Sequence, residues 1–220
     1  MELEKVTKQD KRRYDDACGL AHALDLIGER WAMLVLRELA YGPRRFSELK
    51  ADLPGISANV LTQRLTELED RGLVRRLRLP PPASVQVYEV TEWGLEATPV
   101  IASLGKWAAR SPRHDPTLPM SHVSVMMSLQ TLLSPERAQG MKARVGFRMG
   151  HVGYVATLHD GRLDIDRREP GDCDVTFAGA PTDMVAVIHG GAPFDLIKVE
   201  GDLALARRFV KLFPLPPKAG

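Results

Sequence analysis

The chain has 220 residues, of which 44% are hydrophobic and 26% are charged, and its formal net charge is +2. This composition excludes a disordered or fibrous chain, and the length permits two small domains. Because the net charge is so small, any affinity for nucleic acid must come from local clusters of arginine.

The cysteines and the apolar runs indicate the compartment. Cys18 and Cys173 lie in different halves of the chain and predict no disulfide framework, which suits a reducing environment. Residues 1–16 are charged and lack the apolar core of a signal peptide, and apolar runs such as 123–129 are too short to span a bilayer. We therefore expect a cytoplasmic protein without membrane insertion.

A proline-rich segment divides the chain. Three prolines in residues 111–119 interrupt the helical periodicity between two apolar segments. We expect a mainly helical domain over residues 1–110, a linker over 111–119 and a second domain over 120–220. The predicted fold class is α+β.

A helix-turn-helix is predicted in the first domain. A short amphipathic helix over residues 46–53 ends at Pro54-Gly55, and Ser57 is a good N-cap for the helix that follows. The second helix carries leucines at i, i+4 and i+7, which predict a buried stripe: Leu61, Leu65 and Leu68.

The opposite face of this second helix is polar. A solvated face is the commoner explanation for an isolated helix, but amide and hydroxyl groups are also what reads base edges in a major groove. The candidate DNA-binding residues on this helix are Ser57, Asn59, Thr62, Gln63, Arg64 and Thr66.

The segment after this helix favours the DNA-binding interpretation. After the helix, the chain carries three arginines, Arg75, Arg76 and Arg78, and the next acidic residue is Glu89. Three prolines follow the arginines and precede a β-prone run over residues 85–90. This pattern predicts a β-hairpin, or wing, with a basic arm that would lie against DNA phosphates or the minor groove. Arg44 and Arg45 would add phosphate contacts from the other side.

These features resemble the HxlR-type winged helix-turn-helix regulators, of the MarR-like superfamily, over about the first half of the chain. The resemblance is carried by Cys18, Ala23-Leu24, Ile27-Gly28, Trp31, Leu36-Arg37-Glu38-Leu39, Gly42-Pro43-Arg44-Arg45-Phe46-Ser47-Glu48-Leu49, Pro54-Gly55-Ile56-Ser57, Leu61-Thr62-Gln63-Arg64-Leu65, Glu67-Leu68, Gly72-Leu73-Val74, Tyr88, Thr91 and Gly94. It implies a homodimer that binds double-stranded, near-palindromic operator DNA and dimerises through the helices before and after the winged core. Gly28-Glu29-Arg30 departs slightly from the usual glycine-lysine sequence before the tryptophan.

Cys18 is a candidate redox switch. In some HxlR-like proteins a cysteine at this place senses oxidants or electrophiles, and Cys18 lies four residues before His22 on the same expected helix. The alternative, which we favour, is a small buried thiol at a dimer seam, because no cationic group is obviously placed to lower its pKa.

The second domain resembles the sterol-carrier-protein fold. We expect strands over residues 152–157, 162–167 and 174–178 and a helix over 182–189, followed by a final amphipathic helix. The resemblance implies a small curved antiparallel sheet whose covering helices enclose an apolar tunnel.

The apolar, methionine-rich residues of this domain suit either a pliable ligand cavity or, more commonly, an ordinary core. The candidate ligand-binding residues are Met126, Met127, Phe147, Met149, Met184, Val187, Ile188 and Phe194. No cofactor, metal site or catalytic group is predicted, because the histidines are scattered and no nucleophile has an adjacent base.

Three hypotheses follow. The leading one is a dimeric regulator whose operator affinity changes when an apolar small molecule or lipid binds the second domain. The second keeps the DNA binding and gives that domain a structural or dimerising role. The third, in which the protein is not primarily a regulator, is a lipid carrier or enzyme with a vestigial winged helix.

Overall fold

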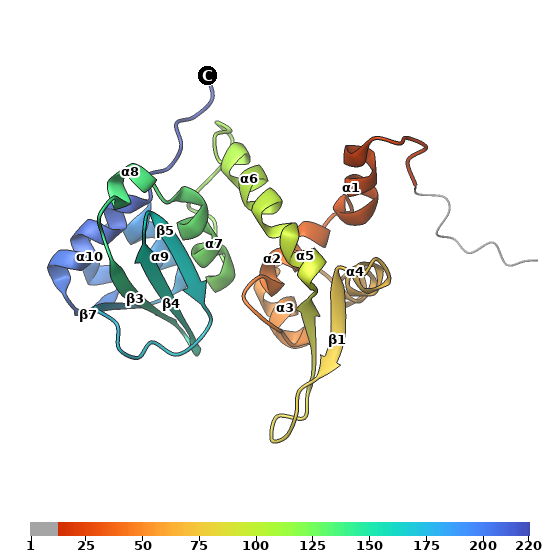
Figure 1. The fold of residues 1–220 in the computed structure, drawn as a ribbon, viewed down its shortest axis with the longest axis horizontal. Helices are drawn as coiled ribbons and strands as arrows, with labels where there is room; N and C mark the ends of the chain where they lie inside the picture. Colours follow the sequence, from red (N-terminus) through yellow and green to blue (C-terminus); the bar gives the residue numbers. More distant parts are fainter. Residues whose placement is uncertain (1–12) are drawn as a thin grey trace, which may run out of the picture. The chain divides into compact units, whose positions relative to one another are not determined.

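The computed structural model describes residues 13–220, so the charged segment 1–12 lies outside the described residues. The chain forms two compact units, drawn in Figure 1. The first contains residues 13–39 and 43–95, and the second contains Ala40–Gly42 and Glu96–Gly220. The division differs from the predicted linker at 111–119, because helix α6 (Thr98–Ala108) packs on α7 (His122–Leu132) and joins the second unit.

The first unit is built from short helices and one hairpin. Its elements are α1 (Gly19–Ile27), α2 (Ala32–Leu39), α3 (Phe46–Asp52), α4 (Ala58–Asp70), β1 (Val74–Arg78), β2 (Gln86–Val90) and α5 (Glu92–Glu96). The turn between α3 and α4 passes through Gly55, whose φ of +89° is readily adopted only by glycine. Ser57 Oγ then accepts a hydrogen bond from the Val60 amide at 3.2 Å and caps α4.

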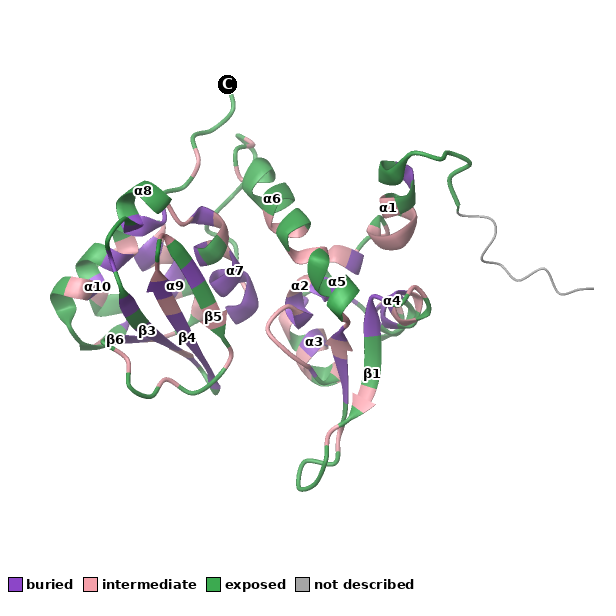
Figure 2. Ribbon diagram, viewed as in Figure 1, coloured by how far each residue is buried: buried purple, intermediate pink, exposed green. Residues whose placement is uncertain are grey.

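The core of this unit confirms the predicted leucine stripe. Leu61, Leu65 and Leu68 are buried, as are Leu39 of α2, a helix that packs against α4, and Leu49 of α3. Figure 2 shows buried residues on these helices. The wing is a two-stranded antiparallel hairpin in which Arg75 pairs with Glu89, so the expected hairpin is also confirmed.

The second unit is a mixed sheet covered by helices. Besides α6 and α7 it contains α8 (Pro135–Ala138), β3 (Ala143–Met149), β4 (Val152–His159), β5 (Arg162–Asp166), β6 (Val175–Ala178), α9 (Pro181–Ile188), η2 (Phe194–Leu196), β7 (Lys198–Gly201), α10 (Leu203–Phe209) and η3 (Val210–Leu212). The strand order is β5-β4-β3-β6-β7. The expectation of an antiparallel sheet was wrong for one pair of strands, because β3 and β6 are parallel, whereas the other three pairs are antiparallel.

One face of this sheet forms the core with α7, α9 and α10. Phe147 of β3 and Phe177 of β6 stack there with ring centroids 5.5 Å apart, and Phe209 of α10 packs against both. Within residues 13–220, no helix combines the length and apolar character needed to cross a membrane.

The opposite face of the sheet is approached closely by the segment 167–174. A Cβ atom on Gly146 would lie 2.7 Å from the Pro170 side chain, and one on Gly153 would lie 2.8 Å from both Pro170 and the Arg168 carbonyl. These two glycines therefore form a notch in neighbouring strands that admits Pro170.

Candidate nucleic-acid interface

The first two turns of α4 present uncharged polar groups to solvent. Ser57, Asn59, Thr62, Gln63 and Thr66 are all exposed. Glutamate and aspartate side chains occur only toward the other end of the helix, at Glu67, Glu69 and Asp70. The uncharged polar groups therefore lie at the N-terminal end of α4, which is also the positive end of the helix dipole. Both features favour the binding of a polyanion at this end of the helix.

Three of these side chains already have intramolecular partners, and one of them is Ser57, which caps the helix as described above. Thr62 Oγ1 donates to the Ala58 carbonyl oxygen at 2.9 Å, and Gln63 Nε2 donates to Glu67 Oε1 at 2.9 Å. Both contacts are exposed, so exchanging them for contacts to a base edge costs little. The Gln63 carbonyl and amide groups suit bidentate recognition of adenine.

Arg64, predicted on the same DNA-binding face, is instead part of the protein interior. It is 5% exposed, and its Nη1 lies 2.7 Å from Glu67 and 3.2 Å from Glu29. The prediction is corrected, since a guanidinium group buried against two carboxylates is not presented to DNA. The helical spacing alone did not reveal this, because Glu29 lies far away in sequence.

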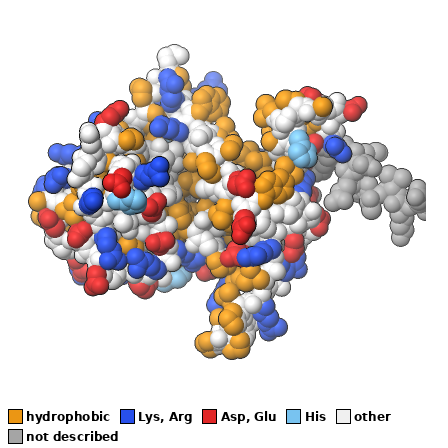
Figure 3. All heavy atoms as spheres, in the orientation of Figure 1, with side chains coloured by type: hydrophobic (Ala, Val, Ile, Leu, Met, Phe, Trp, Pro, Cys, Tyr) orange, Lys and Arg blue, Asp and Glu red, His pale blue; other side chains and the backbone are white. Residues whose placement is uncertain are grey.

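The wing arginines are exposed and paired with carboxylates. Arg75 Nη2 lies 2.6 Å from Glu89, which faces it across the hairpin, and Arg76 Nη2 lies 2.9 Å from Glu69 of α4. Arg76 also lies over the Tyr88 ring. Basic side chains are visible along the hairpin in Figure 3. Exposed ion pairs are weak, so these arginines remain able to contact phosphate.

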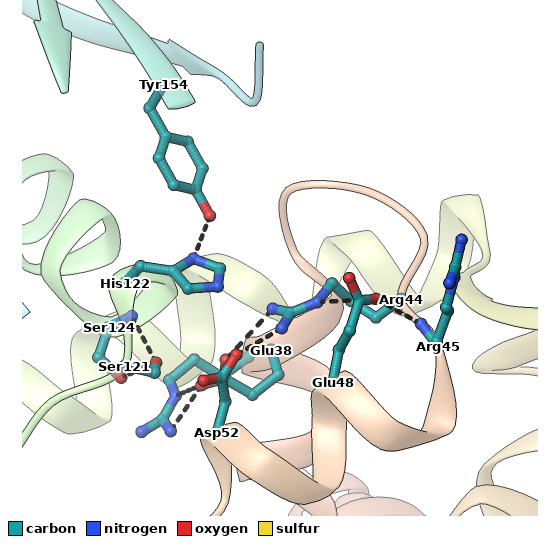
Figure 4. A network of polar contacts seen from close by, with 10 residues as sticks. Glu38, Arg44, Arg45, Glu48, Asp52, Ser121, His122, Ser124 and Tyr154 are labelled. Atoms are coloured by element: carbon teal, nitrogen blue, oxygen red, sulfur yellow. Dashed lines mark hydrogen bonds and ion pairs between the residues drawn. The ribbon is translucent and has the colours of Figure 1, made fainter. Parts of the chain in front are cut away.

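Arg44 and Arg45, predicted together as phosphate contacts, occupy opposite environments. Arg44 is 2% exposed and its guanidinium group is surrounded by carboxylates of three residues: Glu38, Glu48 and Asp52 (Figure 4). Its prediction is corrected, because the group is enclosed by the protein itself. The Arg45 side chain is exposed, and its backbone amide donates a hydrogen bond to Glu48 Oε2 at 2.7 Å.

Cys18 is exposed on the surface of the single chain, and burial at a dimer seam remains a prediction. It occupies the N-cap position of α1, and the backbone N–H groups of Leu20 and Ala21 lower the pKa of its thiol. The sequence alone does not indicate this cause, because backbone amides at a helix start carry no sequence signature of their own.

The candidate ligand-binding residues lie in the core of the second unit. All are buried except Phe194, which is partly exposed and stacks on Phe177.

The second unit also contains polar contacts between side chains. His122 Nδ1 shares a hydrogen bond of 2.6 Å with the Tyr154 hydroxyl (Figure 4). His189 Nε2 lies 3.0 Å from Ser128 Oγ, and its Nδ1 lies 3.2 Å from the Phe213 carbonyl oxygen.

The α3–turn–α4 motif followed by the β1–β2 hairpin defines a winged helix-turn-helix, an architecture of DNA-binding regulators. Residues 26–115 match the family model described as HxlR-like helix-turn-helix. The chain belongs to this family of helix-turn-helix transcriptional regulators.

Relatives of known sequence agree with this assignment. The HTH-type transcriptional regulator YvaP of Bacillus subtilis is 38% identical over 86 residues, covering 39% of this chain and 80% of the relative. YodB of the same organism is 37% identical over 86 residues, covering 39% of this chain and 77% of YodB. An HTH-type regulator of Mycobacterium tuberculosis is 32% identical over 144 residues, covering 58% of this chain and 90% of the relative. A solved structure of reduced YodB aligns with a TM-score of 0.40 and 33% identity, covering 46% of this chain and 100% of that chain.

Proposed function

We propose that the protein binds a near-palindromic operator as a homodimer, with the start of α4 in the major groove and the wing on the phosphate backbone. The observation that carries this proposal is the uncharged, exposed polar face on the first two turns of α4, which ends where the acidic residues begin. Arg45, Arg75, Arg76 and Arg78 supply the phosphate contacts.

The exposed apolar side chains of α6 support a dimer. Within residues 13–220, the side chains of α6 remain unburied, and Val100, Leu104 and Trp107 are exposed. On α1, Leu20 and Leu24 are exposed as well. A second copy covering these helices would remove that apolar surface from water and would set two α4 helices about 34 Å apart, one turn of DNA. Light scattering that shows a stable monomer at micromolar concentration would contradict this.

The experiment on DNA compares two kinds of substitution on a duplex that the full chain selects from a random-sequence library. Arg75→Ala and Arg76→Ala should weaken binding to the selected and to random duplexes alike, and each should lower the slope of log K against log salt by about one. Gln63→Ala should instead reduce discrimination between the two duplexes by about 1–3 kcal/mol. An equal loss on random DNA would reassign Gln63 to phosphate positioning.

A second proposal concerns Cys18 as a sensor of electrophiles. Its exposure and lowered thiol pKa support reactivity, and the relative YodB has been solved in reduced and quinone-bound forms. Addition of the Cys18 sulfur to a quinone ring would form a thioether and transfer the thiol proton to the quinone oxygen. Treatment with benzoquinone should change operator affinity in the wild type and leave Cys18→Ser unaffected. Modification seen by mass spectrometry without any change in affinity would rule out the sensing role.

For the second unit we propose a sterol-carrier-protein-like domain that binds an apolar effector. Its methionine-rich core supports this, since thioether side chains repack around apolar guests. A fatty acid or sterol should then raise the melting temperature and change operator affinity together, and Met184→Gln should weaken both responses. Stabilisation with no change in DNA affinity, or no response to any compound tested, would leave this unit a structural or dimerising role.

A further inference from the structure

The end of the wing differs chemically from its strands. Its residues, 79–85, read Leu-Pro-Pro-Pro-Ala-Ser-Val and are called the wing tip below. The five residues from Pro80 to Ser84 are all exposed, and the nearest charged residues in sequence are Arg78 and Glu89. Figure 3 shows hydrophobic side chains over this end of the hairpin. The wing tip is therefore an exposed apolar surface at the end of a basic arm.

Hydrogen bonds within the hairpin hold the wing tip in one shape. The Leu79 amide donates to the Val85 carbonyl oxygen at 2.9 Å, and the Ser84 amide donates to the Pro80 carbonyl oxygen at 3.3 Å. Arg78 Nε donates to the Ser84 carbonyl oxygen at 3.2 Å, so the last wing arginine also braces the loop. Each of the three prolines has a restricted φ and lacks an N–H group. The surface they present is rigid and offers no backbone donor.

We propose that the wing tip enters the minor groove of the operator as an uncharged apolar contact; this rests on the proposed function. The wing tip is continuous with β1, whose arginines face phosphate in that function, and it lies beyond them along the same hairpin. Proline and leucine are among the apolar side chains that DNA-binding proteins place in the minor groove. That groove is about 6 Å wide, which suits one narrow loop of small side chains.

This contact has two consequences that a basic wing tip would not have. It neutralises no phosphate, so it releases no counterions and adds nothing to the salt dependence of binding. It also discriminates against G·C pairs, because the guanine 2-amino group stands in the minor groove as a donor that an apolar surface leaves unsatisfied. The wing tip thus contributes affinity at A·T pairs through shape and apolar burial.

The test uses the full chain and the duplex it selects from a random-sequence library. One variant carries serine at all three proline positions (Pro80→Ser, Pro81→Ser, Pro82→Ser), and its control carries alanine at the same positions. The serine variant should bind roughly tenfold more weakly, the effect of losing about 55 Å² of buried apolar surface, with an unchanged salt slope. The alanine variant, equally free of proline but apolar, should stay within about threefold of the wild type.

Base substitution tests the groove directly. Replacing A·T pairs under the wing tip with G·C should weaken wild-type binding, whereas inosine·C, which lacks the 2-amino group, should restore it. The serine variant should lose this distinction. Equal affinities for G·C and inosine·C duplexes, equal binding by the serine and wild-type chains, or a salt slope changed by the serine substitutions would each overturn the proposal.

The result separates this inference from the proposed function. If the wild type selects no duplex, the proposed function itself fails. If it selects a duplex and Gln63→Ala weakens the discrimination, while the serine variant binds like the wild type, only the role of the wing tip fails. The serine variant could also bind DNA like the wild type and lose affinity only when a second protein is added. That result would assign the wing tip to a protein partner and would overturn the minor-groove contact.

Discussion

Arg44 Nη1 lies 3.7 Å from Glu38 Oε2, and the two side chains are 3% and 0% exposed. Glu38 also pairs with Arg37 at 2.7 Å, so removing the guanidinium group of Arg44 would take one of its cations from a fully buried carboxylate and would uncover the partly exposed carboxylates of Glu48 and Asp52 as well. This loss is more costly than that of a surface ion pair. We expect Arg44→Met to lower the free energy of unfolding by about 3–5 kcal/mol in urea titrations.

Arg45 is the matched control for this prediction. Its exposed side chain predicts a change in stability of no more than about 0.5 kcal/mol in Arg45→Met, together with a salt slope of DNA binding that falls by about one. If both variants were destabilised equally, the distinction between a structural arginine and a phosphate contact would be wrong.

The notch formed by Gly146 and Gly153 gives a second prediction. An alanine Cβ at Gly146 would lie 2.7 Å from Pro170, and one at Gly153 would lie 2.8 Å from it, so the segment 167–174 must shift. Each substitution should destabilise the second unit by about 1–3 kcal/mol in thermal unfolding. Gly171→Ala is the control, because its Cβ would meet no atom within 4 Å. A double variant with Pro170→Gly should recover part of the loss, and strict additivity would contradict the contact.

The hydrogen bonds of the Lys218 ammonium group give a further prediction. Its Nζ donates hydrogen bonds of 3.1–3.2 Å to three carbonyl oxygens at and beyond the end of α6: Ala109, Ser111 and His114. Lys218→Met should therefore accelerate amide hydrogen exchange at this end of α6 and cost about 1 kcal/mol of stability. Lys211→Met, at another exposed lysine of the same unit, should leave the exchange unchanged. Identical exchange in both variants would show that the three contacts do not hold the helix end.

Burial of His189 predicts a pH dependence. Desolvation lowers the pKa of His189 below its ordinary 6.5, against the opposing effect of the Phe213 carbonyl acceptor. The unfolded chain then binds the proton more readily, so stability is full above about pH 6.5 and falls as the pH drops toward the folded pKa. His159 acts in the opposite sense, because Asp164 and Asp160 raise its pKa.

The measurement is therefore made in a His159→Asn background, which removes that opposing contribution. The free energy of unfolding is measured between pH 5 and pH 8. It should decline toward acid pH in the His189-containing chain, and it should decline less when His189→Gln is added to the same background. Equal pH profiles for the two chains would show that His189 is not the titrating group.

The sequence predicted the local features well and the long-range ones poorly. The leucine stripe of α4, the Ser57 cap and the wing follow from spacing and turn chemistry within a few residues, and the structure confirms them. Arg44 and Arg45 are adjacent residues of the same type, yet their environments differ. The fold brings the carboxylates of Glu38 and Asp52 against Arg44, a contact that the local sequence does not indicate.

The second unit shows the same limit. Strand β3 was not predicted, although its residues alternate between the core and the opposite face, because Arg144, Gly146 and Arg148 dilute its apolar character. Its parallel pairing with β6 joins segments about thirty residues apart, for which the sequence carries no local signal. The need for glycine at positions 146 and 153 also has no local signal, because Pro170 approaches both positions only in the folded chain.

The carboxylates beside the wing arginines bear on how the protein distinguishes its site from bulk DNA. Arg75 and Arg76 pair with Glu89 and Glu69, so in the proposed function each phosphate contact must displace an internal counter-charge. Because exposed ion pairs are weak, this exchange would lower the affinity for every duplex by a small and equal amount, while the proposed contacts from α4 would favour only the matching sequence. Fewer molecules would then be bound to duplexes that lack the operator sequence.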